Sequence, residues 1–229
     1  MSGCWRVLGC RPGTFSGAEL TPLPHPISSR RDGKVWHAEG LSILSNLIVI
    51  EKMVPLFETK RLRFRPWMES DAEVLFKYAS DPDVGPRAGW PPHQSVEESR
   101  TVIRDIFSNG HTWALVLKET GEPIGCMGYH NASESNIEIG PEDAELGYWI
   151  AKPHWNQGLC TEALRSMINW CFNTKGFQTL WGDFFVDNPA SGRVMEKCGF
   201  RDTGETNMLS NLYRGDERPV KIMRLDYAL

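Results

Sequence analysis

Hydrophobic and polar positions follow two different periods along this chain, and the two periods predict strands and helices in turn. In RLRFRPW (61–67), Leu62 and Phe64 alternate with arginines, which is typical of a half-buried strand. From Gly158 onward, apolar residues recur every three or four positions until Gly176. This pattern predicts an amphipathic helix that ends at that glycine.

The same patterns, together with turn residues, organise the rest of the chain after residue 53. The predicted strands span 61–67, two stretches of 111–130 joined by the turn ETGEP (119–123), 144–151, 177–186, 200–209 and 218–226. The predicted helices follow a capping box of Ser70 with Glu73, a second of Ser95 with Glu98, the glycine at 158, and Asn188 with Pro189. The proline-rich stretch 81–93 and the polar stretch 131–143 are predicted as loops. The order β-α-α-β-β-β-α-β-α-β-β predicts one α/β (α+β) domain with a mixed, mostly antiparallel sheet flanked by helices.

Residues 1–52 lack this periodicity. They are rich in Gly, Pro and Ser, and Glu19, Asp32 and the prolines make a poor amphipathic transit helix. We therefore expect 1–52 to be a disordered leader or a mis-assigned upstream extension, with the domain covering 53–229 and Met53 as its start.

Composition narrows the function further. A hydrophobic content of 41% over 229 residues is enough for one substantial core, and a net charge of −4 argues against binding to a nucleic-acid backbone. The longest apolar run, 41–50, is too short to span a membrane. Six cysteines show neither C-x-x-C pairs nor metal-like spacing with histidines, so we expect free thiols, no metal and a reducing, cytoplasmic location. Monomer and homodimer both remain open.

The stretch HWNQGLCTEALRSM (154–167) opens a well-patterned helix without an obvious capping side chain. Uncapped first-turn amides, here from about Gln157 to Thr161, favour an anion, and Gly158 lets a phosphate approach the backbone. No Walker or G-x-G-x-x-G pattern is present, which leaves nucleotide and dinucleotide loops unsupported. The alternative is a tight turn whose amides are solvated.

Two longer segments carry a family resemblance. AELGYWIAKPHWNQGLCTEAL (144–164) and DNPASGRVMEKCGF (187–200) resemble the GNAT superfamily of N-acetyltransferases, in particular its Rim-type branch, which acetylates N-termini of ribosomal proteins. TKRLRFRPW (59–67) and ETGEPIGCMGY (119–129) match the same branch. The family loop Arg/Gln-x-x-Gly-x-Gly/Ala appears with Trp155 in its first place. Asn156 and Cys160 depart from the glycine or alanine that the family prefers.

The resemblance implies an N-acetyltransferase that moves the acetyl group of acetyl-CoA directly to a primary amine. The amine would be a peptide N-terminal α-amine or a small molecule such as an antibiotic or polyamine. The alternative is a non-catalytic domain that senses acyl-CoA. The pantetheine arm would run where strand 144–151 splays from strand 178–186 and pair with exposed backbone there. The implied cofactor-binding residues are Trp149, Ile150, Ala151, Asn156, Gln157, Gly158, Leu159, Cys160, Thr161, Asn188 and Arg193. Asn188 could instead be a plain helix cap, and Arg193 part of a solvated helix face.

Catalytic residues follow from the needs of acetyl transfer. Glu145 is the first candidate for the base that deprotonates the amine, because it shares a strand face with Gly147 and Trp149. Its alternative is a structural carboxylate paired with an arginine of 61–67, and His130 and Asp183 are lesser candidates for the base. Many family members protonate the leaving thiolate with a tyrosine, but Met195 occupies that position here.

Ser191, one turn before Met195, is therefore the candidate general acid, with a surface hydroxyl as the alternative. For the acceptor, the rigid segment GWPPH (89–93) offers Trp90 and His93 as a wall of the substrate pocket. Trp90 could equally fill the core.

Overall fold

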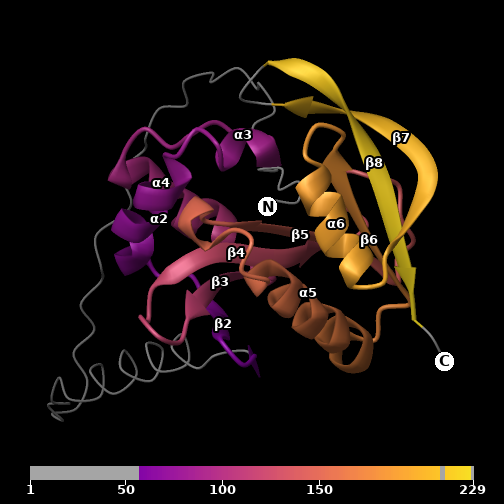
Figure 1. Cartoon of the computed structure of the whole chain (residues 1–229), viewed down its shortest axis with the longest axis horizontal. Helices are drawn as coiled ribbons and strands as arrows, with labels where there is room; N and C mark the ends of the chain where they lie inside the picture. The colour runs from indigo at the N-terminus through magenta and orange to yellow at the C-terminus, as the bar shows by residue number, and fades with distance from the viewer. Residues whose placement is uncertain (1–56, 212–214, 228–229) are drawn as a thin grey trace, which may run out of the picture.

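The computed structural model describes residues 57–211 and 215–227 and contains one sheet flanked by helices on both faces (Figure 1). The strands lie in the order β1-β2-β3-β4-β5-β6-β8-β7. Their bounds are β1 Phe57–Glu58, β2 Leu62–Pro66, β3 Thr112–Leu117, β4 Pro123–His130, β5 Asp143–Ile150, β6 Thr179–Phe185, β7 Arg201–Asn211 and β8 Asp216–Asp226. The predicted single α+β domain with a mixed, mostly antiparallel sheet is confirmed. The predicted leader 1–52 lies outside the described residues.

The helices also follow the predicted order. They are α2 Ala72–Ala79, α3 Gly85–Ala88, α4 Val96–Val102, α5 Leu159–Trp170 and α6 Pro189–Lys197. Short 3-10 turns at Glu69–Asp71 and Lys152–His154 precede α2 and α5, and π-helical turns at Ile103–Phe107 and Cys171–Lys175 extend α4 and α5. Gly176 ends the second of these turns with a φ of 76°, as its position predicted. In the part of the chain that the structure describes, no helix is both long and apolar enough to cross a bilayer.

Two local predictions are wrong. The capping box of Ser70 with Glu73 does not form, because the carboxylate of Asp71 accepts the Met68 N–H instead (3.0 Å) and α2 starts after a 3-10 turn. The stretch 81–93 is not wholly loop either, since α3 forms within it. Proline is tolerated in the first turn of a helix, where its missing N–H has no partner to lose.

The predicted capping box of Ser95 with Glu98 is confirmed for the hydrogen bond that Ser95 accepts. The Glu98 N–H donates to Ser95 Oγ (3.0 Å), so Ser95 caps α4. The Glu98 carboxylate reaches back one residue further than in an ideal capping box and accepts the N–H of Gln94.

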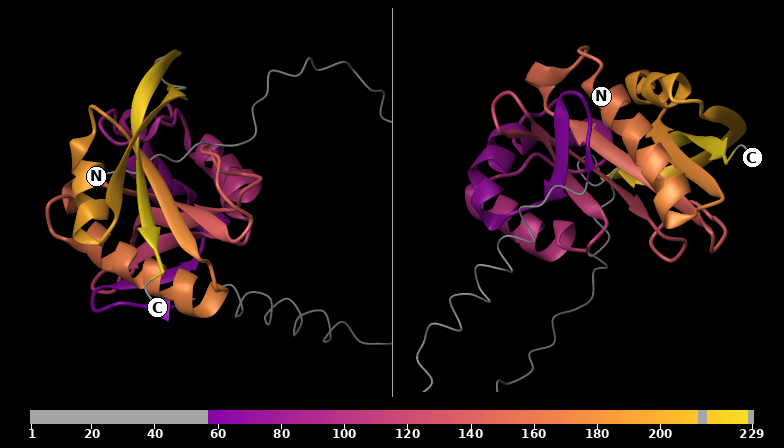
Figure 2. Two further views of the ribbon diagram at one scale, coloured as in Figure 1. Left: turned by 90° about the vertical axis from the view of Figure 1, so that its right-hand side faces the viewer. Right: turned by 90° about the horizontal axis from the view of Figure 1, so that it is seen from below.

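Helices cover both faces of the sheet (Figure 2), and a large hydrophobic cluster lies on each face. On one face α5 packs through Ala163, Leu164 and Met167 against the sheet. On the other face α2, α3 and α4 cover Trp149 and its neighbours. Because side chains alternate along a strand, Tyr148 of β5 faces the α5 side while Trp149 faces the α2–α4 side.

The sheet contains one parallel junction, between β5 and β6. The two strands pair only at Asp143–Thr179, Ala144–Leu180 and Glu145–Trp181. Beyond this point β5 continues to Ile150 along β4, and β6 continues to Phe185 along β8. The two strands therefore part after Glu145 and Trp181, as the family resemblance implied.

Candidate active site

The site begins at the start of α5, where the helix opens without a side-chain cap. Gly158 is the N-cap residue in a left-handed conformation (φ 74°), and Asn156, two residues before it, is also left-handed (φ 60°). The Glu162 N–H closes the first turn on the Gly158 carbonyl (3.0 Å). The amides ahead of Glu162 therefore point out of the helix end, where the dipole adds positive potential.

A cavity of about 130 Å³ lies between this helix start and α6. It is lined by Asn156, Gly158, Cys160 and Thr161 on one side and by Ala190, Arg193, Val194 and Lys197 on the other. The structure thus brings the predicted Arg193 next to the predicted phosphate loop. Lys197, which the sequence reasoning missed, lies one turn after Arg193 on the same helix face. Its spacing of four residues from Arg193 was the available signal.

Arg61 supports the loop from behind and was also missed. Its guanidinium donates to the Gln157 carbonyl (2.9 Å) and pairs with the Glu162 carboxylate (2.7 Å). Leu159 points inward and is buried in the core. Arg61 and Leu159 together hold the loop against the domain while the amides around Gly158 stay at the surface.

The β5 residues whose backbone faces the opening between β5 and β6 are shifted by one position from those predicted. Ala151 donates its N–H to Ile124 of β4 (2.8 Å), and its carbonyl accepts the His154 N–H (2.9 Å). Antiparallel pairs alternate between bonded and non-bonded, so the backbone of Trp149 is also directed to β4. The prediction of an exposed backbone at Trp149 and Ala151 is wrong.

Tyr148 and Ile150, rather than Trp149 and Ala151, are the residues whose backbone faces the opening between β5 and β6. Their backbone groups alternate with those of Trp149 and Ala151 and therefore point toward β6. The carbonyl of Ile150 is already used, since it accepts the Trp155 indole N–H (2.6 Å).

Ser191 lies at the inner end of this opening, on the first turn of α6. It is fully buried, and the Tyr148 hydroxyl lies 3.1 Å from its Oγ and 3.0 Å from its carbonyl oxygen. Burial raises the pKa of Tyr148 well above 10.0, so the phenol stays protonated at neutral pH. Met195 is buried one turn later. The predicted alternative, a surface hydroxyl at Ser191, does not describe this buried group.

Cys160 borders this cavity, whereas Cys198 does not. Burial raises the pKa of Cys160 far above 9.0, and it raises the pKa of Cys198 to about 11. Both thiols are free and protonated, so neither offers a thiolate for an acyl-enzyme. Cys126 and Cys171 are also free, as predicted, whereas Cys4 and Cys10 lie outside the described residues.

Glu145 is almost fully buried on the α2–α4 face. Its Oε2 accepts hydrogen bonds from Ser135 Oγ and from the Asn136 N–H, both at 2.8 Å. The predicted alternative, an ion pair with an arginine of 61–67, is not the arrangement seen. Arg61, Arg63 and Arg65 pair instead with Glu162, Glu58 and Asp71.

The two lesser candidates for the base are buried on the same face as Glu145. His130 lies opposite Glu145 on β4, and burial lowers its pKa to about 4, which leaves it neutral. Asp183 of β6 is almost fully buried.

Trp90 lies beside Trp149, and His93 lies beside Trp90; both are buried. The Trp90 ring is 6.0 Å from the Trp149 ring at 67°, and His93 Nδ1 lies 2.7 Å from Ser99 Oγ. Burial lowers the pKa of His93. The position of Trp90 fits the alternative in which it fills the core.

Asn188 joins this segment to α6. It stands at the N-cap position of α6, but its side chain makes no capping bond there, and its amide donates to the Arg87 carbonyl (3.1 Å). The alternative in which the Asn188 side chain caps α6 is therefore wrong, because the side-chain amide bonds to Arg87. It does not line the cavity beside Gly158.

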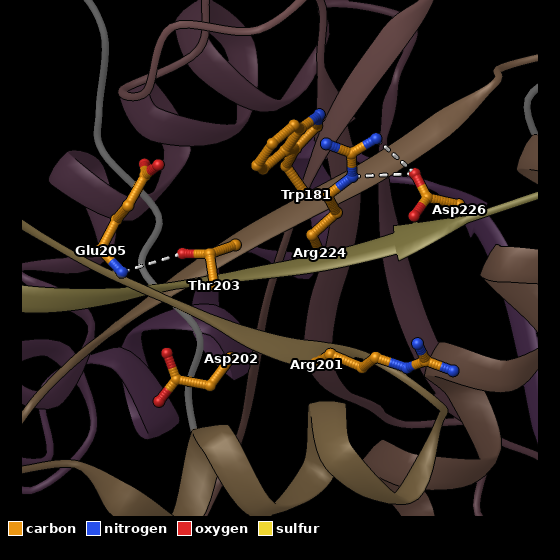
Figure 3. A pocket seen from close by; sticks show the side chains of 7 residues that line it. All are labelled: Trp181, Arg201, Asp202, Thr203, Glu205, Arg224 and Asp226. Carbon is orange, nitrogen blue, oxygen red and sulfur yellow. Dashed lines mark hydrogen bonds and ion pairs between the residues drawn. The ribbon is translucent and has the colours of Figure 1, made fainter.

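A second cavity, of about 310 Å³, opens between β6, β7 and β8 (Figure 3). The Arg224 guanidinium lies over the Trp181 ring (5.0 Å) and pairs with Asp226, while Asp202 pairs with Lys221. These charges compensate one another, and none of the predicted site residues borders this cavity.

Comparison with known proteins matches this arrangement to one family. Residues 61–201 match the family described as "Acetyltransferase (GNAT) domain". The chain is 29% identical over 157 residues to an uncharacterized N-acetyltransferase, YoaA, of Bacillus subtilis, covering 66% of this chain and 86% of that protein. It is 26% identical over 115 residues to the ribosomal-protein-serine acetyltransferase of Escherichia coli, covering 48% and 62%. The structure of a putative ribosomal-protein-serine acetyltransferase from Vibrio cholerae shares the fold, with a TM-score of 0.62, 22% identity and coverage of 76% and 100%.

Proposed function

Because this chain belongs to the GNAT family and is thus an acetyl-CoA-dependent N-acetyltransferase, we propose that it acetylates peptide N-terminal α-amines from a cofactor held between α5 and α6. The observation that carries the proposal is one juxtaposition. The outward amides around Gly158, together with Arg193 and Lys197, border a single cavity beside the strands that part. This is the donor set that a diphosphate requires.

The residues present fit acetyl-CoA along its length. The amides from Gly158 to Thr161 would receive the pyrophosphate, and Arg193 and Lys197 would add positive charge. The backbone of Tyr148 and Ile150, which points toward β6, would hold the pantetheine arm as an added strand is held. Acetyl-CoA supplies the activated thioester. A backbone N–H of β5 would polarise its carbonyl, a contribution worth about 3 kcal/mol.

Proton transfer would use one group on each side of β5. Glu145, on the α2–α4 face, would accept the proton of the ammonium. Ser191, on the α6 side, would donate a proton to the leaving thiolate, with Tyr148 fixing its hydroxyl. The protonated state of Cys160 supports direct transfer without a covalent enzyme intermediate.

The acceptor follows from chemistry and from similarity. An α-amine has a pKa near 8, against about 10.4 for lysine, so its deprotonation at neutral pH requires little from a base. The similar Escherichia coli protein is named for acetylating a ribosomal protein, which supports a Rim-type acceptor.

The test is an acceptor panel with the purified full chain and acetyl-CoA, read as release of the CoA thiol. We expect turnover with peptides that carry a free N-terminus. We expect none with the same peptides blocked at the N-terminus but retaining a lysine. Spermidine and an aminoglycoside serve as small amines. Faster turnover on either of these than on every free peptide would contradict the α-amine acceptor.

A further inference from the structure

A second group of chemistry-bearing side chains lies at the far end of β5 from the cofactor cavity. His111 immediately precedes β3, His130 ends β4, and Glu134 follows in the next loop. One donor atom from each of these residues lies within 4.8 Å of the other two. The two histidines lie together at the open end of the β3–β4 hairpin but 19 residues apart in sequence, which is why their spacing shows no metal motif.

The distances suit a transition-metal ion. Zinc binds histidine nitrogen and carboxylate oxygen at about 2.0–2.2 Å in a tetrahedron, which separates neighbouring ligand atoms by about 3.3 Å. His111 Nε2 and Glu134 Oε2 are already 3.2 Å apart. Glu134 is partly exposed on a loop, so small side-chain rotations bring the third donor to the same spacing.

Independent support comes from neighbouring polar atoms that are buried without a hydrogen-bond partner among the described residues. They are Thr112 Oγ1 and both side-chain polar atoms of Asn136. Thr112 opposes Gly128, two residues from His130 on the same strand face, and Asn136 bonds through its backbone N–H to Glu145, which opposes His130. Buried polar atoms of this kind are rare in native proteins and indicate an ion or water that satisfies them.

We propose that His111, His130 and Glu134 bind one divalent transition-metal ion of the Zn²⁺ class. Two imidazoles and one carboxylate favour such an ion over Mg²⁺ or Ca²⁺, which prefer all-oxygen ligands. Water fills the fourth position, within reach of the polar atoms of Thr112 and Asn136. The ion joins the loop after β4 to the sheet. It lies where β5 is still paired with β6, beside the proposed base Glu145 and away from the cavity between α5 and α6.

The experiment uses the full chain stripped of metal with EDTA and titrated with Co²⁺, followed by absorbance, and with Zn²⁺, followed by calorimetry. We expect one equivalent of each ion per chain and a rise in Tm with Zn²⁺, because a ligand that binds only the folded state stabilises it. Mg²⁺ at the same concentrations is expected to produce neither effect.

Variants assign the ligands. Glu134→Gln and His111→Gln are expected to weaken Zn²⁺ binding at least tenfold. Glu138→Gln, in the same loop, and His154→Gln, near α5, serve as controls that bind like the wild type. His130→Ala tests the third ligand, and if that variant fails to fold, the two loop-side variants decide the result. Absence of stoichiometric binding overturns the proposal. Binding that is unchanged in Glu134→Gln also overturns it, because the ion would then be held by other ligands such as cysteines.

Discussion

The hydroxyl of Tyr148 on β5 lies 3.1 Å from Oγ of Ser191 on α6, and both groups are fully buried. This contact bridges the opening between β5 and β6 from the α6 side. It places a phenol from the strand beside the serine, although the helix position that carries tyrosine in many relatives holds Met195. The pair thus gathers two hydroxyl groups at the point proposed for protonating the thiolate.

Replacing Ser191 with alanine tests its role as the general acid. We expect kcat to fall on the order of 100-fold, while the Kd for acetyl-CoA stays unchanged. Steady-state kinetics and calorimetry measure the two quantities. Ser166→Ala, the same change on α5, is the control and should leave kcat as it is. A loss below about threefold in Ser191→Ala would remove the assignment.

Tyr148→Phe separates positioning from proton donation. If Tyr148 acts through Ser191, kcat should fall by about tenfold with little change in KM for either substrate. A larger loss than in Ser191→Ala would make Tyr148 itself the proton donor.

Gly158→Val tests the phosphate loop. A β-branched residue at a φ of 74° is strained by about 1–2 kcal/mol, and its Cβ would lie 3.7 Å from Nη2 of Arg61, the residue that holds the loop. We expect acetyl-CoA binding to be abolished in calorimetry. Gly121→Val is the matched control, since Gly121 has a φ of 73° in the β3–β4 turn with open space around it. It should lose similar stability and retain acetyl-CoA affinity, and equal affinities in the two variants would refute the loop.

The charge on α6 gives a fourth prediction. Arg193→Ala combined with Lys197→Ala removes two cations from the cavity beside Gly158. We expect the Kd for acetyl-CoA to rise about tenfold or more and to depend less on salt concentration. Lys175→Ala, at the other end of the α5 helix, should change neither. An unaltered Kd in the double variant would place the diphosphate elsewhere.

Packing beneath α6 gives a prediction for stability. A Cβ at Gly192 would lie 2.5 Å from the Phe184 ring, so Gly192→Ala forces the helix away from β6. We expect a loss of about 1–3 kcal/mol in the free energy of unfolding, measured in urea. Adding Phe184→Leu provides room and should recover part of the loss. If the double variant is no more stable than predicted from the two single changes, the clash is not the cause.

The sequence predicted local features well and long-range pairings poorly. The uncapped start of α5 and the glycine that ends its extension depend on neighbouring residues alone, so periodicity and cap chemistry were sufficient. The backbone of β5 was assigned one residue out of phase. Alternation along a strand is visible in sequence, but which neighbour receives each N–H is decided by register with β4.

Contacts between distant segments had no local signal. Tyr148 with Ser191, Arg61 with Gln157, and the amide of Asn188 with Arg87 each join elements far apart in the chain. The short helix α3 was missed for another reason. Its proline, Pro86, was interpreted as a helix breaker together with the prolines around it, although the first turn of a helix accepts proline.

Parting β5 from β6 gives the sheet two inner edges in addition to its outer edges at β1 and β7. Unpaired strand edges usually invite association with other chains. Here the two inner edges face each other and meet where the strands still pair, at Glu145 and Trp181. An unbranched chain that carries its own amides could pair with such an edge through the backbone alone. The unpaired backbone that would invite another protein is thus the same backbone that the proposed cofactor would occupy.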